Sequence, residues 1–105
     1  MREAKYSWTE DKDEKGNQIH REPDFSILCG VRKRDNPIYT DVPRFIAEIL
    51  SDSTEKDDRG EKMNLYLKVG VEEIWLIDPR IITIERYILD DDGKSFWFHD
   101  SIKKR

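Results

Sequence analysis

Two acidic side chains lie in stretches of sequence that are otherwise largely apolar. Asp24 directly precedes the largely apolar residues 25–29, and Glu48 lies within residues 44–51, where Phe45 to Leu50 are otherwise apolar. A carboxylate that is removed from water costs several kcal/mol unless a partner compensates its charge. A divalent cation shared by both carboxylates would supply that compensation and also a chemistry. Asp24 and Glu48 are therefore candidate metal ligands.

A lysine follows these acids in a segment with helical signals. Asp58 and Glu61 have the spacing of a capping box, apolar residues follow at helical intervals, and Gly70 suits a helix C-cap. These signals predict a helix over residues 58–69, with Asp58 as its N-terminal cap rather than a metal ligand. Lys62 and Tyr66 are four residues apart and share one face of this helix. From the residues alone, an ordinary surface lysine is the favoured interpretation of Lys62.

The remaining apolar residues predict a sheet around this helix. Alternating or apolar runs bounded by turn residues are typical of strands. The expected order is three strands, the helix, a fourth strand and a terminal hairpin, which is an α/β arrangement in a single domain over residues 1–105. The predicted strands are residues 5–9, 19–29, 44–50, 73–78, 83–89 and 95–99, with a turn at residues 10–18 and a loop at residues 30–43.

Composition restricts the classes of partner. Charged residues make up 40% of the 105 residues and the formal net charge is −4, so no global basic field draws the chain to nucleic acid. Contact with DNA would depend on the basic runs 32–34 and 103–105, which are also typical of solvated loops and ends. The single cysteine, Cys29, can form no intrachain disulfide, and no apolar run approaches the roughly 18 residues of a membrane span. We therefore expect a cytoplasmic protein without a membrane segment.

The motifs taken together resemble a known nuclease family. The chain resembles the PD-(D/E)xK nuclease superfamily and, more closely, the Uma-two family of restriction-endonuclease-like proteins. The resemblance covers roughly residues 19 to 90 and includes the predicted order of strands and helix. The residues that carry it are Pro23-Asp24, residues 48–51 with Ser53-Thr54, Asp58-Arg59, Lys62, Tyr66 and residues 70–79.

The resemblance implies an activity and a set of site residues. It implies a restriction-endonuclease-like fold with a mixed sheet. It also implies that the protein hydrolyses phosphodiester bonds in DNA with Mg²⁺ or Mn²⁺. Asp24 and Glu48 would bind the metal together with the main-chain carbonyl of Ile49. The superfamily places its lysine two residues after the second acid, where this chain has Leu50. Lys62 is the matching position in the family, and it would orient or deprotonate the attacking water.

A second departure from the family pattern concerns the N-terminus. Domains of this family open with a helix before the Pro-Asp motif, whereas none of the 22 residues before Pro23 has helical signals. We expect an N-terminally shortened domain whose sheet lacks cover on one face, and hence a homodimer. Two functional hypotheses follow: a metal-dependent endonuclease acting on DNA, or a catalytically inactive remnant of the nuclease fold that serves as a binding module.

Overall fold

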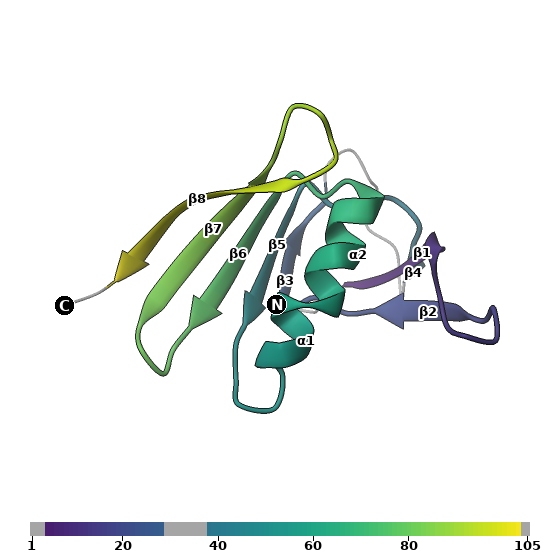
Figure 1. Ribbon diagram of the computed structural model, residues 1–105. Helices are drawn as coiled ribbons and strands as arrows, with labels where there is room; N and C mark the ends of the chain where they lie inside the picture. The colour runs from purple at the N-terminus through teal and green to yellow at the C-terminus, as the bar shows by residue number, and fades with distance from the viewer. Residues whose placement is uncertain (1–3, 29–37, 104–105) are drawn as a thin grey trace.

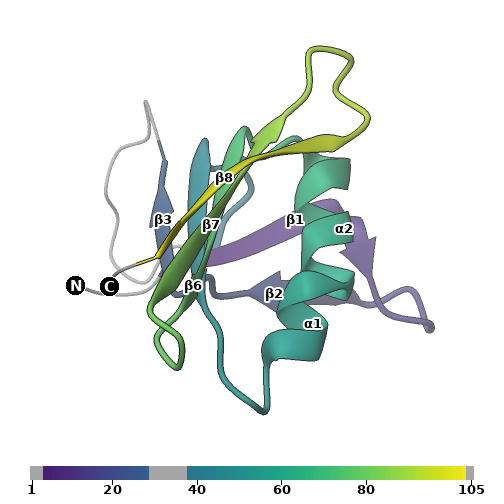
Figure 2. The ribbon, with the colours of Figure 1, turned by 60° about the vertical axis from the view of Figure 1, so that its left-hand side comes forward.

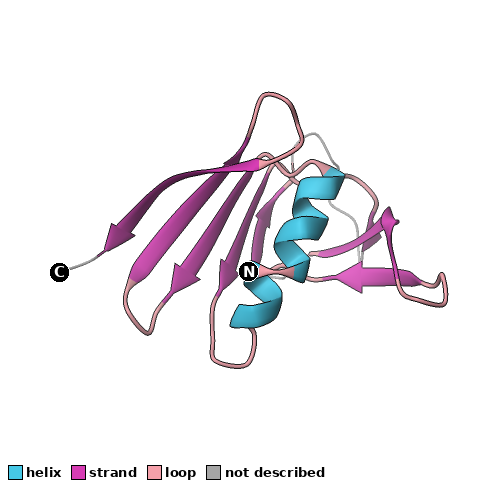
Figure 3. Ribbon diagram, viewed as in Figure 1, coloured by secondary structure: helices cyan, strands magenta, loops and turns pink. Residues whose placement is uncertain are grey.

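The computed structural model describes residues 4–28 and 38–103 (Figure 1). One bent helical segment lies between β5 and β6 in the chain, and all other elements are strands, as Figure 3 shows by colour. Residues 1–3, 29–37 and 104–105 lie outside this description, and with them Cys29, the basic run 32–34 and the last two residues of the basic run 103–105. The elements are β1 (Lys5–Lys12), β2 (Gln18–Arg21), β3 (Phe25–Ile27), β4 (Ile38–Tyr39), β5 (Phe45–Ile49), α1 (Glu55–Arg59), α2 (Glu61–Val69), β6 (Glu73–Asp78), β7 (Thr83–Leu89) and β8 (Phe96–Lys103).

The strands form two sheets. The larger sheet has the order β3-β5-β6-β7-β8, and the smaller one has the order β2-β1-β4. In the larger sheet only β5 and β6 are parallel, and the helical segment α1–α2 connects them. Parallel neighbours need such a crossover, because a tight turn can join antiparallel strands only. The sheet is therefore mixed, as the sequence predicts.

Gly60 divides the helix into two parts. It is the last cap of α1 and the first cap of α2, and its amide donates to the carbonyl of Lys56. A Cβ atom at Gly60 would lie 3.0 Å from that same carbonyl oxygen, so the bend favours glycine. The prediction of one helix over residues 58–69 is wrong at its start, because α1 begins at Glu55. The C-cap prediction is confirmed, since Gly70 has a φ of 91° in the left-handed region.

Several strand predictions are confirmed and others are wrong. β1 extends to Lys12, into the predicted turn, and β4 lies within the predicted loop at residues 30–43. The strand at residues 73–78 is β6, and the predicted terminal hairpin is β7 with β8. Residues 19–29, however, do not form one strand. Pro23 separates β2, which lies in the small sheet, from β3, which pairs with β5 in the large one. Proline cannot donate to a ladder, and this break moves Asp24 to the entrance of β3.

The small sheet and both helices pack on the same side of the large sheet (Figure 2). Tyr6 and Trp8 of β1 are fully buried against Tyr66 and the inward side chains of β5 and β6. The Trp8 indole also donates to the carbonyl of Asp41, which fixes β1 across the core. The buried cluster is Tyr6, Trp8, Ile46, Leu50, Leu65, Tyr66, Val71, Ile74 and Leu76. The N-terminal residues thus supply core on the helix side.

The opposite face of the large sheet is apolar and open. Ile27 and Ile49 expose 47% and 52% of their surface there. No helix in the described part of the chain covers this face (Figure 2). Among the described residues, no helix is long and apolar enough to cross a membrane. The residues that line its pocket are Phe25, Ile27, Phe45, Ala47, Ile49, Glu73, Trp75 and Ile77.

Candidate active site

Glu48 is a buried acid on a central strand. Side chains alternate along β5, so Ile46 and Glu48 point to the helix side while Ala47 and Ile49 point to the open face. Glu48 has only 1% of its surface exposed. The hydroxyl of Tyr66 donates a 2.7 Å hydrogen bond to its Oε1 atom. The carboxylate therefore has a partner in α2, without which its burial would be costly.

Lys62 lies one helical turn before Tyr66 and also reaches this carboxylate. Its Nζ atom is 3.4 Å from Oε2 of Glu48 and 2.9 Å from Oδ1 of Asp58. The expected shared face of Lys62 and Tyr66 is confirmed, since both contact Glu48. Burial alone would lower the pKa of the lysine, but its ion pairs with Asp58 and Glu48 outweigh this effect and raise the pKa. Lys62 is thus a cation that bridges two carboxylates.

Asp58 is a site residue that the sequence interpretation missed. It does not cap a helix, because it lies inside α1, where Thr54 is the N-cap residue. Only 1% of its surface is exposed. The four-residue spacing between Asp58 and Lys62 is the signal that could have found the pair, because acid and base at this spacing are neighbours on a helix. The pair was missed because the spacing of Asp58 and Glu61 was interpreted as a capping box.

Asp24 approaches the same strand from the other side. Its Oδ2 atom accepts a 2.8 Å hydrogen bond from the amide of Ile49, one residue beyond Glu48. The side chain is exposed at the entrance of β3. In an extended strand the amide and carbonyl of one residue face the same edge, so we expect the carbonyl of Ile49 on the side of Asp24. The structure therefore brings Asp24, Glu48 and Lys62 to one end of β5.

The charge of this cluster perturbs Glu48. Burial raises its pKa from 4.5 to about 7, and the nearby charges of Asp24 and Asp58 act in the same direction. The hydrogen bond from Tyr66 and the charge of Lys62 oppose the increase. Burial and the charge of Glu48 also raise the pKa of Tyr66, which remains a neutral donor. A strongly perturbed acid beside specific charged partners is typical of functional sites.

The cluster fits a hard cation that is bound by few protein atoms. Within residues 4–28 and 38–103, no group of three or more acidic, histidine or cysteine side chains could by itself hold a metal ion. Two carboxylates and one main-chain carbonyl are nevertheless oxygen donors of the kind that Mg²⁺ takes, and Mg²⁺ keeps several waters. A positively charged ion would also favour the ionised form of Glu48. The residues that could hold it are Asp24, Glu48 and, through its carbonyl, Ile49.

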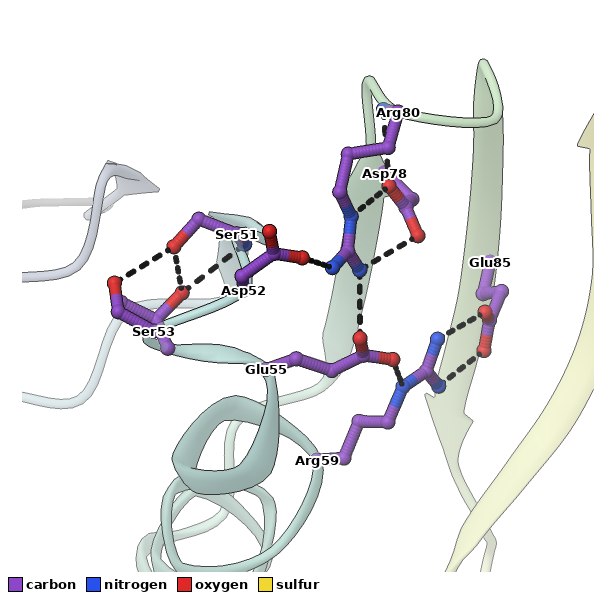
Figure 4. Close-up of polar contacts among 9 residues, drawn as sticks. Ser51, Asp52, Ser53, Glu55, Arg59, Asp78, Arg80 and Glu85 are labelled. Atoms are coloured by element: carbon purple, nitrogen blue, oxygen red, sulfur yellow. Dashed lines mark hydrogen bonds and ion pairs between the residues drawn. The ribbon is translucent and has the colours of Figure 1, made fainter.

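Arg80 joins the loop before α1 to the end of β6. Its guanidinium contacts Asp78 at 2.9 Å, Asp52 at 2.6 Å and Glu55 at 2.6 Å (Figure 4). Asp78 is buried, and its ion pair with Arg80 lowers its pKa. Planar guanidinium groups suit such multiple carboxylate contacts. The turn that leads from β5 into α1 is thereby fixed.

Arg59 fastens the other end of α1. Two of its nitrogens lie 2.9 and 2.7 Å from the two carboxylate oxygens of Glu85 on β7, and a third contacts Glu55 at 2.6 Å (Figure 4). The bidentate contact fixes direction as well as distance. Since Asp58 is the neighbouring residue, this contact also fixes the backbone that carries Asp58 beside Lys62.

The N-terminal hairpin holds the start of α2. Arg21 of β2 contacts the buried Asp11 of β1 at 2.7 Å and Glu61 at 3.4 Å. Glu61 directly precedes Lys62 in the chain. The small sheet therefore contributes to the position of the lysine, a role that the sequence did not predict.

A mixed sheet with a parallel β5–α–β6 crossover and acids on adjacent strands is a restriction-endonuclease-like fold. The chain belongs to the Uma2 family, whose model matches residues 5–97 and is described as "Putative restriction endonuclease". This confirms the family resemblance within the PD-(D/E)xK superfamily. An uncharacterized protein of Synechocystis sp. is 35% identical over 72 residues, which make up 68% of this chain and 38% of that protein. The matched segment thus spans well under half of that relative.

Proposed function

We propose that this chain is a metal-dependent nuclease that hydrolyses phosphodiester bonds in DNA. The observation that carries the proposal is the convergence of three groups on one end of β5. Asp24 contacts the amide of Ile49, and Lys62 contacts the neighbouring Glu48. Membership in a family described as "Putative restriction endonuclease" supports the reaction class.

Each residue of the cluster would have a different role in the proposed reaction. A bound Mg²⁺ or Mn²⁺ ion would activate water and stabilise charge at the phosphate. Asp24, Glu48 and the carbonyl of Ile49 would hold it, while Tyr66 keeps Glu48 oriented through their 2.7 Å hydrogen bond. Lys62 would orient the attacking water or neutralise developing charge from the helix side. Leu50 is buried in the core with 1% exposure, so the usual lysine position takes no part.

Nicking of supercoiled plasmid in Mg²⁺ or Mn²⁺ tests this proposal. Cleavage should disappear in Asp24→Ala and Glu48→Ala and fall sharply in Lys62→Ala. Lys68→Ala is the matched control, because Lys68 is an exposed lysine of the same helix. Undiminished cleavage by Lys62→Ala would show that this lysine has no role. Failure of the folded wild type to cleave with any divalent metal would instead favour the inactive binding module.

We further propose that the active form is a homodimer. The open apolar face supports this, because each large apolar side chain left in water forfeits about 1.5–3 kcal/mol relative to burial. Ile27, Ile49 and Trp75 on this face point away from Glu48, which faces the helices. Pairing through this face would cover it without obstructing the helix side. A two-fold dimer would also present two sites to the two strands of a duplex.

A further inference from the structure

We propose that Asp58 is a positioning residue that holds the ammonium of Lys62 in place for the reaction. The inference rests on the proposed function and adds a fourth side chain to it. It explains why an acid is buried inside α1, where it caps no helix.

Asp58 is the closer of the two partners of Lys62. The Nζ atom lies 2.9 Å from Oδ1 of Asp58 but 3.4 Å from Oε2 of Glu48. The Asp58 side chain is 1% exposed, whereas that of Lys62 is 27% exposed. Oδ1 of Asp58 accepts no hydrogen bond from the described residues. The ion pair with the ammonium of Lys62 is therefore the one described contact that compensates the charge of this buried oxygen.

A metal ion would leave Lys62 dependent on Asp58. A cation bound to Glu48 would withdraw negative charge from the ammonium and repel it. The lysine side chain is long and flexible, so the loss of one contact would free its charged end. Asp58 belongs to α1 and is not among the proposed ligands. It can therefore keep Nζ beside the site when the metal is bound.

The Asp58–Lys62 pair spans the bend in the helix, and α1 is attached to the sheet. Asp58 belongs to α1 and Lys62 to α2, and Gly60 lies between them at the bend. Arg59 anchors α1 to Glu85 through two contacts of 2.9 and 2.7 Å. The carboxylate of Asp58 is thus placed by a part of the helix that is itself attached to the sheet.

A double-mutant cycle tests whether Asp58 acts through Lys62. Single-turnover nicking should fall at least tenfold in Asp58→Asn, because small displacements of a catalytic group are costly. Adding Asp58→Asn to Lys62→Ala should cause no further loss. Asp57→Asn, an exposed neighbour with the same charge change, is the control and should match wild type. An equal loss in both backgrounds would overturn the proposal, because Asp58 would then act independently of the lysine.

Asp58→Glu separates position from charge. It keeps the carboxylate but moves it by one methylene, so a positioning role predicts a loss of about tenfold although the protein folds. Wild-type rates in Asp58→Glu would contradict positioning. This variant also keeps the test open if Asp58→Asn does not fold.

NMR of the lysine ammonium tests the same contact without catalysis. The ¹⁵Nζ resonance of Lys62 should be observable with slowly exchanging protons in the wild type and in Asp57→Asn, and it should be lost in Asp58→Asn. Persistence of the signal in Asp58→Asn would overturn the proposal even if the enzyme is active. Loss of the signal in a protein that never cleaves DNA would support the contact and refute only the nuclease.

Discussion

The hydroxyl of Tyr66 donates a 2.7 Å hydrogen bond to Oε1 of Glu48, which links the middle of α2 to the central strand β5. Tyr66 is 1% exposed, as is Glu48, so both side chains are buried. Lys62 approaches the other oxygen of the same carboxylate at 3.4 Å. Glu48 thus has each oxygen assigned to a different residue of one helix face, and its orientation is set by the fold.

Tyr66→Phe should destabilise the protein and weaken metal binding. The buried Oε1 atom would lose its described donor, which costs about 1–3 kcal/mol. Urea unfolding measures the stability and calorimetry with Mn²⁺ the affinity. Tyr87→Phe is the control, because its hydroxyl donates to Glu85, which keeps its bidentate contact with Arg59. Equal effects of both variants on Mn²⁺ affinity would argue against a specific role of Tyr66.

The stability of the metal-free protein should fall as the pH rises from about 4.5 to 7. Burial raises the pKa of Glu48 from 4.5 to about 7, so the folded state binds more protons than the unfolded state in this window. The loss is on the order of 3 kcal/mol and is complete above the folded pKa. Glu48→Gln lacks this titration and should show a flatter profile in denaturant melts at pH 5, 6 and 7. Parallel profiles of the two proteins would be inconsistent with the raised pKa.

Arg59→Met should lower the free energy of unfolding more than the loss of an exposed ion pair does. Arg59 makes a bidentate contact with Glu85, whose side chain is 18% exposed, so we expect a loss of about 1 kcal/mol and faster hydrogen exchange in α1. The control is Lys5→Met, which breaks a pair with Glu22 whose side chains are 55% and 44% exposed. Its cost should be below about 0.5 kcal/mol. A smaller effect at Arg59 than at Lys5 would refute the anchoring role.

A charge on the open face should prevent dimer formation. We expect a dimer mass for the wild type in sedimentation at micromolar concentration and a monomer for Ile27→Lys, because a charge buried between two apolar faces is unfavourable. Ile81→Lys is the control, since Ile81 is 55% exposed in the turn after β6, outside the pocket-lining residues. A monomeric wild type would contradict the dimer proposal but not the metal site.

The sequence predicted the central part of the fold well because its signals there are local. The apolar residues 74–77 of β6, the glycine cap at Gly70 and the terminal hairpin each depend on a few neighbouring residues. The split of residues 19–29 was missed because Pro23 was not interpreted as a break between two strands that belong to different sheets. Such a change depends on distant pairing partners, which a single sequence does not reveal.

The site was predicted in part for the same reason. Glu48 stands out because an acid in an apolar strand is locally unusual. Asp58 was missed because its spacing to Glu61 also fits a capping box, and only the tertiary structure shows that it is buried beside Lys62. The contribution of Arg21 depends on the packing of the hairpin against α2 and left no local signal.

Anomalous diffraction from a crystal soaked in Mn²⁺ would locate the metal site. We expect one Mn²⁺ ion at the end of β5, bound by carboxylate oxygens of Asp24 and Glu48 and by the carbonyl of Ile49, with Lys62 still beside Asp58. Crystals of Glu48→Gln soaked in the same way should show no such peak. An absence of bound Mn²⁺ at this position in the wild type, or a peak that contacts neither Asp24 nor Glu48, would contradict the account.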